Sequence, residues 1–376
     1  MDLFSRLACL EAISKIDALD KEQKATVLYP KWTLVMFQFL ASAGACAIWF
    51  GGSWWDILVA GLCGILVGYI GTLPILSREQ RLIFEALASF SVGLVAGLVS
   101  IRYPTQLCYG AIAISGVLDI LQGFRTVYAV IEIMSKHTVS GTADFLEGIF
   151  YTGLIAFFLR AGLEAAATIM DEKIVEDEEF LQCNEGIDPL FYIVWAPVAA
   201  FSWSGMFSPD YKDLPWMTFH GILAYVVSWL MGEYSTFNEE SQLFVASMCV
   251  TFSAGVVSRF TGRQALGNTV SGLYVVLPGA YLVKSLFAPN FTLDFLAEVF
   301  FKASVIGVGA WTGSILCSPT LLGTNVGMLK LNMKYLRRFR RAKSNPGLHV
   351  HGEETEPVRR DRPERPQNGT GTILFF

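Results

Sequence analysis

The stretch that decides the fold is TQLCYGAIAISGVLDILQGFRTVYAVIEIMS, residues 105–135. Its apolar run is long enough to cross a bilayer, which takes about 20 residues in a helix. Four charged or amide side chains interrupt that run: Asp119, Gln122, Arg125 and Glu132. A lipid-facing helix disfavours each central charge by roughly 2.5–3.5 kcal/mol. We therefore expect a membrane helix broken in its middle, around Gly123, with these side chains turned towards protein or water.

A second copy of this pattern lies further along the chain. The motif Ser115-Gly116-x4-Leu121-Gln122-Gly123 recurs 156 residues later as Ser271-Gly272-x4-Leu277-Pro278-Gly279. Residues 88–100 likewise match residues 246–258, 158 positions later, mainly at small residues. Two interrupted apolar segments in corresponding halves indicate the binding site of a transporter.

The composition supports a membrane protein. Of the 376 residues, 53% are hydrophobic and only 16% are charged, whereas a soluble domain has about 25% charged residues. The net charge of −5 is uninformative, because acidic and basic residues fall in different loops. We expect an all-α polytopic protein whose partner is the lipid bilayer, and no nucleic-acid partner.

Ten apolar segments predict ten spans in two sets of five. They cover residues 32–50, 54–76, 82–101, 106–134, 143–168, 189–207, 214–234, 241–260, 264–288 and 294–317. The corresponding regions are a cytosolic amphipathic segment (1–30), a first five-helix repeat (31–170), an acidic extracytosolic linker (171–188), a second five-helix repeat (189–320) and a basic, then disordered, cytosolic tail (321–376). Because five spans is an odd number, the second repeat is inverted relative to the first, with the fourth and ninth helices broken.

The distribution of lysine and arginine favours one orientation of the chain in the membrane. They gather at the N-terminus, in alternate loops and in the tail from Lys330 to Lys343, so both termini are predicted to be cytosolic. The acidic residues of 171–188 then lie outside the cytosol, either as a solvated linker or as a vestibule that attracts cations. A plasma membrane and a vacuolar or other endomembrane are both compatible with this arrangement.

The cysteines predict no cross-link. The seven are Cys9, Cys46, Cys63, Cys108, Cys183, Cys249 and Cys317, most of them within apolar runs and none in a C-x-x-C pair. We expect them to act as small buried hydrophobes, with neither a disulfide framework nor a zinc site.

A broken helix offers free carbonyls at one half-helix and free amides at the other, which suits a zwitterion or a carboxylate with a coupling proton. The candidate substrate-binding residues are Ser115, Gly116, Asp119, Gln122, Gly123, Arg125, Glu132, Asn268, Ser271, Gly272, Pro278 and Gly279. An alternative for two of them is that Asp119 pairs with Arg125 and only pins the helix. Lys284 can contact a substrate carboxylate or extend to the interface.

Other ionisable residues in the apolar segments have simpler interpretations. Glu298 and Lys302 are spaced to pair on one helix face. Glu85 and Glu147 lie near segment ends, where a charge costs little, and His220 reads as a core histidine rather than a proton relay. The sequence contains no H-E-x-x-H motif and no P-loop, and Val275 stands where a second aspartate would match Asp119. We therefore expect no enzyme, catalytic residue, metal or cofactor.

Several motifs resemble the threonine/serine exporter family, in the fungal pheromone-regulated membrane protein branch that fuses both membrane halves. They are Tyr29-Pro30-Lys31-Trp32, Phe50-Gly51-Gly52-Ser53-Trp54-Trp55-Asp56, Phe84-Glu85, Cys108-Tyr109-Gly110, Gly123-x8-Glu132, Val139-Ser140-Gly141-Thr142 and Gly262-Arg263-x3-Gly267-Asn268-Thr269-x-Ser271-Gly272-x4-Leu277-Pro278-Gly279. Compared with that family, the chain starts late in the cytosolic region before the first span. It also has Leu121-Gln122-Gly123 where Leu-Pro-Gly is usual, so we expect a softer kink.

The resemblance implies a ten-span exporter of small amino acids, with split bacterial relatives associated with succinate export. We expect a secondary transporter of threonine, serine or a similar small molecule, driven by the proton gradient. A dicarboxylate exporter, a non-transporting scaffold or receptor, and a channel are the alternatives. Homo-oligomerisation is left open by the sequence.

Overall fold

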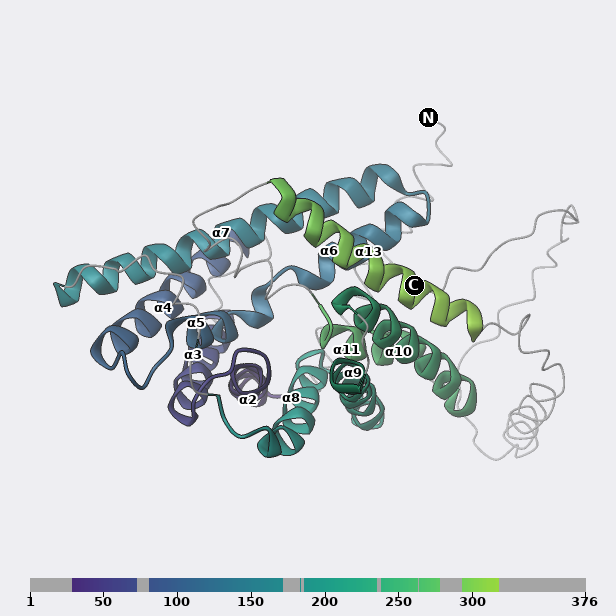
Figure 1. The fold of residues 1–376 in the computed structure, drawn as a ribbon, viewed down its shortest axis with the longest axis horizontal. Coiled ribbons are helices and arrows are strands. Elements are labelled where there is room, and N and C mark those ends of the chain that lie inside the picture. The colour runs from purple at the N-terminus through teal and green to yellow at the C-terminus, as the bar shows by residue number, and fades with distance from the viewer. Residues whose placement is uncertain are drawn as a thin grey trace, which may run out of the picture. The chain divides into compact units, whose positions relative to one another are not determined.

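The computed structural model describes residues 29–72, 81–171, 183, 186–234, 238–262, 264–277 and 293–317 (Figure 1). The chain divides into two units, Met1–Ser314 and Ile315–Phe376. All helices described below belong to the first unit, except for the last residues of α13. The predicted amphipathic segment before residue 29, most of the acidic linker and the polar tail lie outside the described residues.

Every regular element of the described chain is helical, as the sequence predicts. The first half contains α2 (Lys31–Trp49), α3 (Trp54–Thr72), α4 (Arg81–Arg102), α5 (Tyr109–Gly116), the 3-10 helix η2 (Leu118–Ile120), α6 (Gly123–Met134) and α7 (Thr138–Met170). The second half contains the 3-10 helix η4 (Pro189–Phe191), α8 (Tyr192–Met206), α9 (Leu214–Tyr234), α10 (Glu239–Thr261), α11 (Ala265–Tyr274) and α13 (Leu293–Leu316).

The number of spans is smaller than ten in the described chain. Seven helices are long and apolar enough to cross a membrane, and the bent segment from Tyr109 to Met134 makes an eighth. Helix α8 has only 15 residues, and α11 has ten and runs into residues outside the described part. An all-helical membrane protein is therefore confirmed, while the ten-helix arrangement stays a prediction.

Turn residues set the ends of several helices. Pro30 precedes α2, where a missing amide proton costs nothing. Gly51, between α2 and α3, has φ +60°, a left-handed conformation that glycine adopts without strain. Gly262 ends α10 in the same way at φ +70°, and its amide donates to Ser258 O at 2.8 Å.

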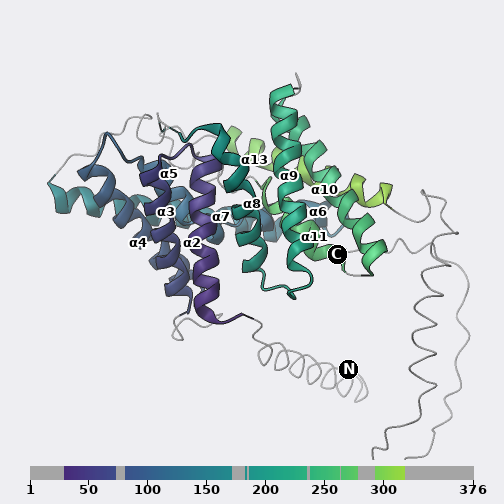
Figure 2. The ribbon, with the colours of Figure 1, turned by 90° about the horizontal axis from the view of Figure 1, so that it is seen from below.

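Helices α3, α2, α8 and α9 pack one against the next in that order, and Figure 2 shows them side by side. The α2–α8 contact joins the two halves of the sequence. A Cβ on Gly44 would lie 2.7 Å from Ala199 Cβ, so the backbones approach closely there. Helices α4 and α7 also approach closely, because Gly93 and Gly162 leave room for the backbone of the facing helix.

The broken helix passes from one hydrophobic core to another. Residues of α5 and η2, from Tyr109 to Ile120, belong to a core that they form with α2, α3, α4 and α7. Val127, Val130 and Ile131 of α6 instead pack in a second core, with α9, α10, α11 and α13. The break between α5 and α6 therefore lies where the two cores meet.

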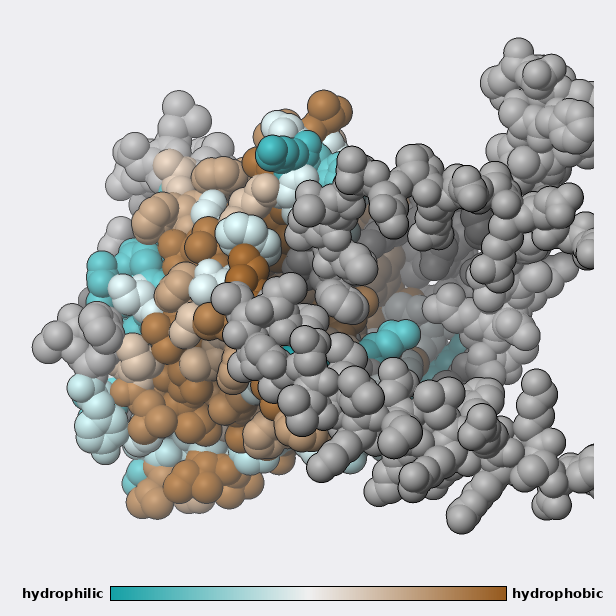
Figure 3. Space-filling view, turned by 90° about the vertical axis from the view of Figure 1, so that its right-hand side faces the viewer, coloured by the Kyte–Doolittle hydropathy of each residue, from teal (hydrophilic) through white to brown (hydrophobic). Residues whose placement is uncertain are grey.

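Much of the outer surface is apolar. Large hydrophobic side chains such as Leu62, Phe150, Phe157 and Phe301 are more than half exposed, and Figure 3 shows a broad hydrophobic area on one face. Trp32, Trp54 and Trp55 are exposed at helix starts, the position that membrane interfaces favour for tryptophan. This surface suits a lipid environment.

Candidate functional site

The predicted break of the fourth membrane segment is confirmed. Helix α5 ends at Gly116, η2 follows, and Leu121 adopts an extended conformation (φ −66°, ψ 138°) before α6 begins at Gly123. The two parts are bent by 47°. Backbone groups between Val117 and Gln122 are thus partly freed from the regular helical pattern.

Asp119 lies in the middle of this break, on η2. Both of its carboxylate oxygens are buried, and neither makes a hydrogen bond of standard geometry with any described residue. The hydroxyl of Tyr274, the last residue of α11, faces the Asp119 carboxyl. The Tyr274 ring packs 5.6 Å from Trp203 and 5.7 Å from Phe207 of the second half.

Helix α11, which precedes the second predicted break, therefore meets the first broken helix. Helix α11 ends at Tyr274, and Val275 and Val276 form a turn after it. Pro278, Gly279 and Lys284, where the sequence predicts the break and a cationic partner, lie outside the described residues. Within the described chain, α11 ends at Tyr274, four residues before Pro278, and the Tyr274 hydroxyl lies next to Asp119.

Gln122 connects the break to helix α4. Its Nε2 donates to Glu85 Oε1 at 3.1 Å and to Ile120 O at 3.4 Å. Glu85 and Gln122 are both buried within the protein, so the Glu85 carboxyl packs against the broken helix instead of facing the surroundings. The carboxyl is drawn inwards because an amide from the broken helix satisfies one of its oxygens.

The alternative pairing of Asp119 with Arg125 is also wrong. Arg125 points to α7, where it donates to Asp144 Oδ1 at 2.8 Å and to Glu147 Oε2 at 2.6 Å. Glu147, near the start of its predicted segment, thus takes part in an ion pair. Glu132 lies two turns further along α6, where its carboxyl interacts with Tyr128. Arg125 thus joins α6 to α7, while Glu132 interacts with a residue of its own helix.

The two repeated serines have different partners. Ser115 donates within its own helix, to Ala111 O and Ile112 O. Ser271 links three helices, since its hydroxyl lies 2.8 Å from Ser204 Oγ and donates to Met217 O at 2.9 Å. Asn268 is buried one turn earlier on α11.

The two repeated glycines make matching helix contacts. A Cβ on Gly116 would lie 2.9 Å from Val92 Cγ1, and a Cβ on Gly272 would collide with Val250. Val92 and Val250 are themselves equivalent positions in the sequence repeat. Both glycines therefore allow the broken helices to pack closely.

Two further expectations hold. Lys302 Nζ lies 3.5 Å from Glu298 Oε1, which confirms the predicted pair, and it also bonds both Glu239 carboxylate oxygens at 3.1 Å. The His220 ring is fully buried, with Nδ1 2.7 Å from Trp216 O. A carbonyl partner fits a core histidine.

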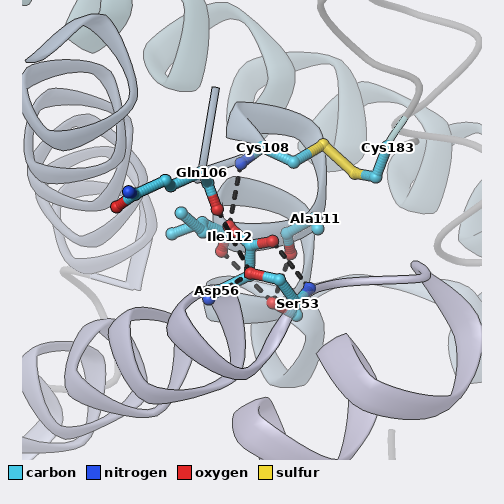
Figure 4. Close-up of a disulfide and its surroundings, with 8 residues drawn as sticks. Ser53, Asp56, Gln106, Cys108, Ala111, Ile112 and Cys183 are labelled. Atoms are coloured by element: carbon cyan, nitrogen blue, oxygen red, sulfur yellow. Dashed lines mark hydrogen bonds between the residues drawn. A yellow bond between two sulfur atoms is a disulfide. The ribbon is translucent and has the colours of Figure 1, made fainter. Parts of the chain in front are cut away.

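A disulfide joins Cys108 and Cys183, 75 residues apart in sequence, which corrects the prediction that no cross-link forms (Figure 4). Cys108 precedes α5, and its amide donates to Asp56 Oδ1 at 2.8 Å. The other oxygen of Asp56 accepts from the Ser53 amide at 2.8 Å. The start of the broken helix is thus fastened to both the α2–α3 turn and the linker. Cys46, Cys63 and Cys249 are free thiols.

The candidate residues predicted from the sequence did not include Glu85 and Tyr274, which contact residues of the break. The disulfide was not predicted either. Glu85 carried a signal, because it is a carboxylate inside an apolar segment and part of a family-like motif. The disulfide pairs two cysteines predicted to lie on the same side of the membrane. Nothing in the sequence singled out Tyr274, except that it directly precedes Val275, the position that matches Asp119 in the repeat.

Comparisons with known proteins agree with this architecture. A family profile described as "Putative threonine/serine exporter" matches residues 5–165, and one described as "Threonine/Serine exporter, ThrE" matches residues 192–316. No solved structure matches the chain.

Fungal relatives match across both halves. The chain is 24% identical to Pheromone-regulated membrane protein 10 of Saccharomyces cerevisiae (strain S288c) over 263 residues, 69% of this chain and 67% of that protein. It is 23% identical to the Kluyveromyces lactis protein of that name over 261 residues, 69% of this chain and 27% of the relative. With the Candida albicans (strain SC5314) protein, it shares 24% over 279 residues, 73% of this chain and 25% of the relative. The chain therefore spans only about a quarter of the last two relatives. Since the two profiles together cover both membrane halves, the chain belongs to the threonine/serine exporter family, in its fungal branch.

Proposed function

We propose that this chain is a secondary transporter that exports small amino acids resembling threonine or serine, coupled to the proton gradient. The observation that carries the proposal is the meeting of the first broken helix with α11, where Asp119 faces Tyr274 at the end of α11. Paired interruptions of this kind form the substrate sites of many secondary transporters.

An inverted repeat is part of the proposal, and α2 and α8 support it. Tyr29 packs against Tyr211, Phe37 against Gly205 and Gly44 against Ala199. Residue numbers rise along α2 as they fall along α8, so the first long helices of the two halves run antiparallel. This is what inversion of the second half requires.

Equivalent contacts in the two halves support the same arrangement. Gly116 packs on Val92 as Gly272 packs on Val250, and Gly162 packs on Phe90 O as Gly313 packs on Met248 O. In the sequence repeat, Val92 matches Val250 and Phe90 matches Met248. The halves can then rock as similar bodies about the site.

The orientation that we propose has both termini in the cytosol. The distribution of lysine and arginine favours it. The Cys108–Cys183 bond supports it independently, because disulfides persist in oxidising, extracytosolic compartments and both cysteines fall on the predicted outer side.

For the substrate site we propose the groups around the first break, namely Gln122, Gly123, Asn268 and the carbonyls of Val117–Gln122, with Asp119 beside them as a separate acid. The carbonyls suit the ammonium group of an amino acid. A dicarboxylate such as succinate is disfavoured, because Asp119 is an acid and Arg125 is held by Asp144 and Glu147. Arg125, Glu132, Ser115, Gly116, Ser271 and Gly272 then shape the helices around the site.

The test is efflux of labelled threonine, serine and succinate from cells that express the chain, with and without a proton gradient. We expect faster threonine or serine efflux than in empty cells, with little change for succinate. Faster succinate efflux alone would favour a dicarboxylate exporter. If the chain reaches the membrane and no solute moves faster, a scaffold or receptor is the better interpretation.

A further inference from the structure

The contact between Asp119 and Tyr274 joins the first break to the end of α11 through two titratable side chains. The Asp119 oxygens are buried, and the one arginine of the same segment, Arg125, is engaged by α7. Tyr274 is held in place by Trp203 and Phe207. The phenol therefore reaches the carboxyl from a fixed position on the opposite half.

The other titratable groups near Asp119 are of types that are neutral at physiological pH, or they are separated from Asp119 by Gln122. Helices α2 and α5 pack against η2, and they contribute Cys46 and Tyr109, both buried and both of types that are ordinarily protonated at neutral pH. Glu85 of α4 is reached through the Gln122 amide. Asp119 is thus an acid that faces the other half of the protein through Tyr274.

Building on the proposed function, we propose that Asp119 carries the coupled proton and that Tyr274 is the positioning residue that responds to its charge. Ionised Asp119 accepts a hydrogen bond from the Tyr274 hydroxyl and holds the first break against the end of α11. A proton entering from one aqueous side neutralises the carboxylate, and the same proton leaves to the other side after the halves have rocked. Since a hydrogen bond to a carboxylate is roughly twice as strong as a neutral one, protonation loosens the contact.

Glu85 has a different part in this scheme. Its carboxyl receives the Gln122 amide, and both residues belong to the first half. A change in the charge of Glu85 would act on the shape of the break without touching the contact between the halves. This difference allows the two carboxyls to be separated by experiment.

The transport test uses the purified full chain in liposomes, with labelled threonine or serine, whichever the wild-type chain moves. One assay follows exchange of solute without a proton gradient, and the other follows uphill transport driven by an imposed gradient. We expect Asp119→Asn to keep exchange and to lose gradient-driven transport by at least about tenfold, the effect of losing a charge-assisted contact. Asp119→Glu should restore part of the driven transport. Tyr274→Phe should flatten the pH dependence of exchange.

The exchange and gradient-driven assays also provide the control and the outcomes that would contradict the proposal. Glu164→Gln, in the exposed pair with Arg160, should match the wild type in both, and each variant must remain monodisperse with a wild-type melting temperature. Loss of both exchange and driven transport in folded Asp119→Asn would make Asp119 a substrate ligand and overturn the proposal. Full retention of driven transport would overturn it equally.

A spectroscopic test does not depend on transport. On acidification, infrared difference spectra of the wild type should gain the C=O stretching band of a buried protonated carboxyl. That band should disappear in Asp119→Asn and shift in Tyr274→Phe. If the wild type moves no solute but shows this band, the proposed function fails while the proton site stands. If the band persists in Asp119→Asn and is unchanged in Tyr274→Phe, the proton site fails.

Discussion

The broken helix of the first half and α11 of the second half share their packing and differ in their chemistry. Gly116 and Gly272 make equivalent contacts with Val92 and Val250, yet the first break contains Asp119 and the second helix, Ala265–Tyr274, contains no charged residue. Duplication of a helix pattern therefore preserved the surfaces that pack, while the polar groups diverged. A site built this way has its charge on one side and a neutral hydroxyl on the other.

The two helices also differ in how they are anchored. Helix α5 is fastened at its start by the Cys108–Cys183 bond and by Asp56, which accepts the Cys108 amide. Helix α11 follows Gln264, whose side chain does not cap the helix. Rocking of one half against the other would then leave the start of α5 fixed and let α11 adjust.

Loss of the disulfide should have the largest effect on the difference in anchoring between α5 and α11. Cys108→Ser opens a closed loop of 75 residues and should lower the free energy of unfolding by up to about 4 kcal/mol. Hydrogen exchange at the start of α5 should rise towards that at the start of α11. Cys249→Ser is the matched control, because Cys249 is free and aligns with Ser91 in the repeat. Equal stability of the two variants would show that the anchor contributes nothing.

A buried cation provides the next test, since each half holds one cation between two carboxylates. The Lys302 side chain is 4% exposed and its partner Glu239 is 65% exposed, whereas Arg125 is 30% exposed. Glu239→Gln leaves a buried ammonium with less compensation and should cost about 3 kcal/mol. Lys302→Met should cost less, because the carboxylates left behind can be hydrated.

Thermal unfolding in detergent measures both Lys302 variants, with Glu164→Gln as the exposed control expected to change stability by less than about 1 kcal/mol. The reverse order, with Lys302→Met the more damaging, would contradict this account of the buried cation.

The sequence predicted where the spans lie because apolar length and periodicity are local properties. The predicted span at 214–234 coincides with α9, and the one at 82–101 differs from α4 by one residue at each end. The break around Gly123 was also predictable, since charges in an apolar run need a non-lipid environment. These features depend on neighbouring residues alone.

The partners of the charged residues could not be predicted in the same way. Arg125 had an acid six residues away at Asp119, but it pairs with Asp144 and Glu147 on the next helix. Glu85 turned inwards because Gln122 reaches it across helices. The composition of each segment does not determine which helix faces which, and that arrangement selects the partner of a long side chain.

The shared glycine contacts can be tested directly. Alanine at Gly116 or Gly272 adds a Cβ that meets a valine side chain, and overpacking of this kind should cost about 2 kcal/mol at each position. Gly153→Ala is the control, because a Cβ there meets nothing within 4 Å and the substitution favours the helix. Unequal losses at Gly116 and Gly272 would break the equivalence of the two halves.

The smallest expected change in stability comes from the repeated serines, whose hydrogen bonds differ although their helices pack in the same way. Ser271→Ala removes bonds to Ser204 and to Met217 O on neighbouring helices and should cost about 1 kcal/mol. Ser115→Ala removes bonds within its own helix and should be nearly neutral. Melting temperatures of the two variants give the comparison, and solute efflux gives a second reading. Because neither serine is assigned to the substrate, efflux should follow stability in both. A strong loss of efflux in stable Ser115→Ala would instead place that hydroxyl at the substrate.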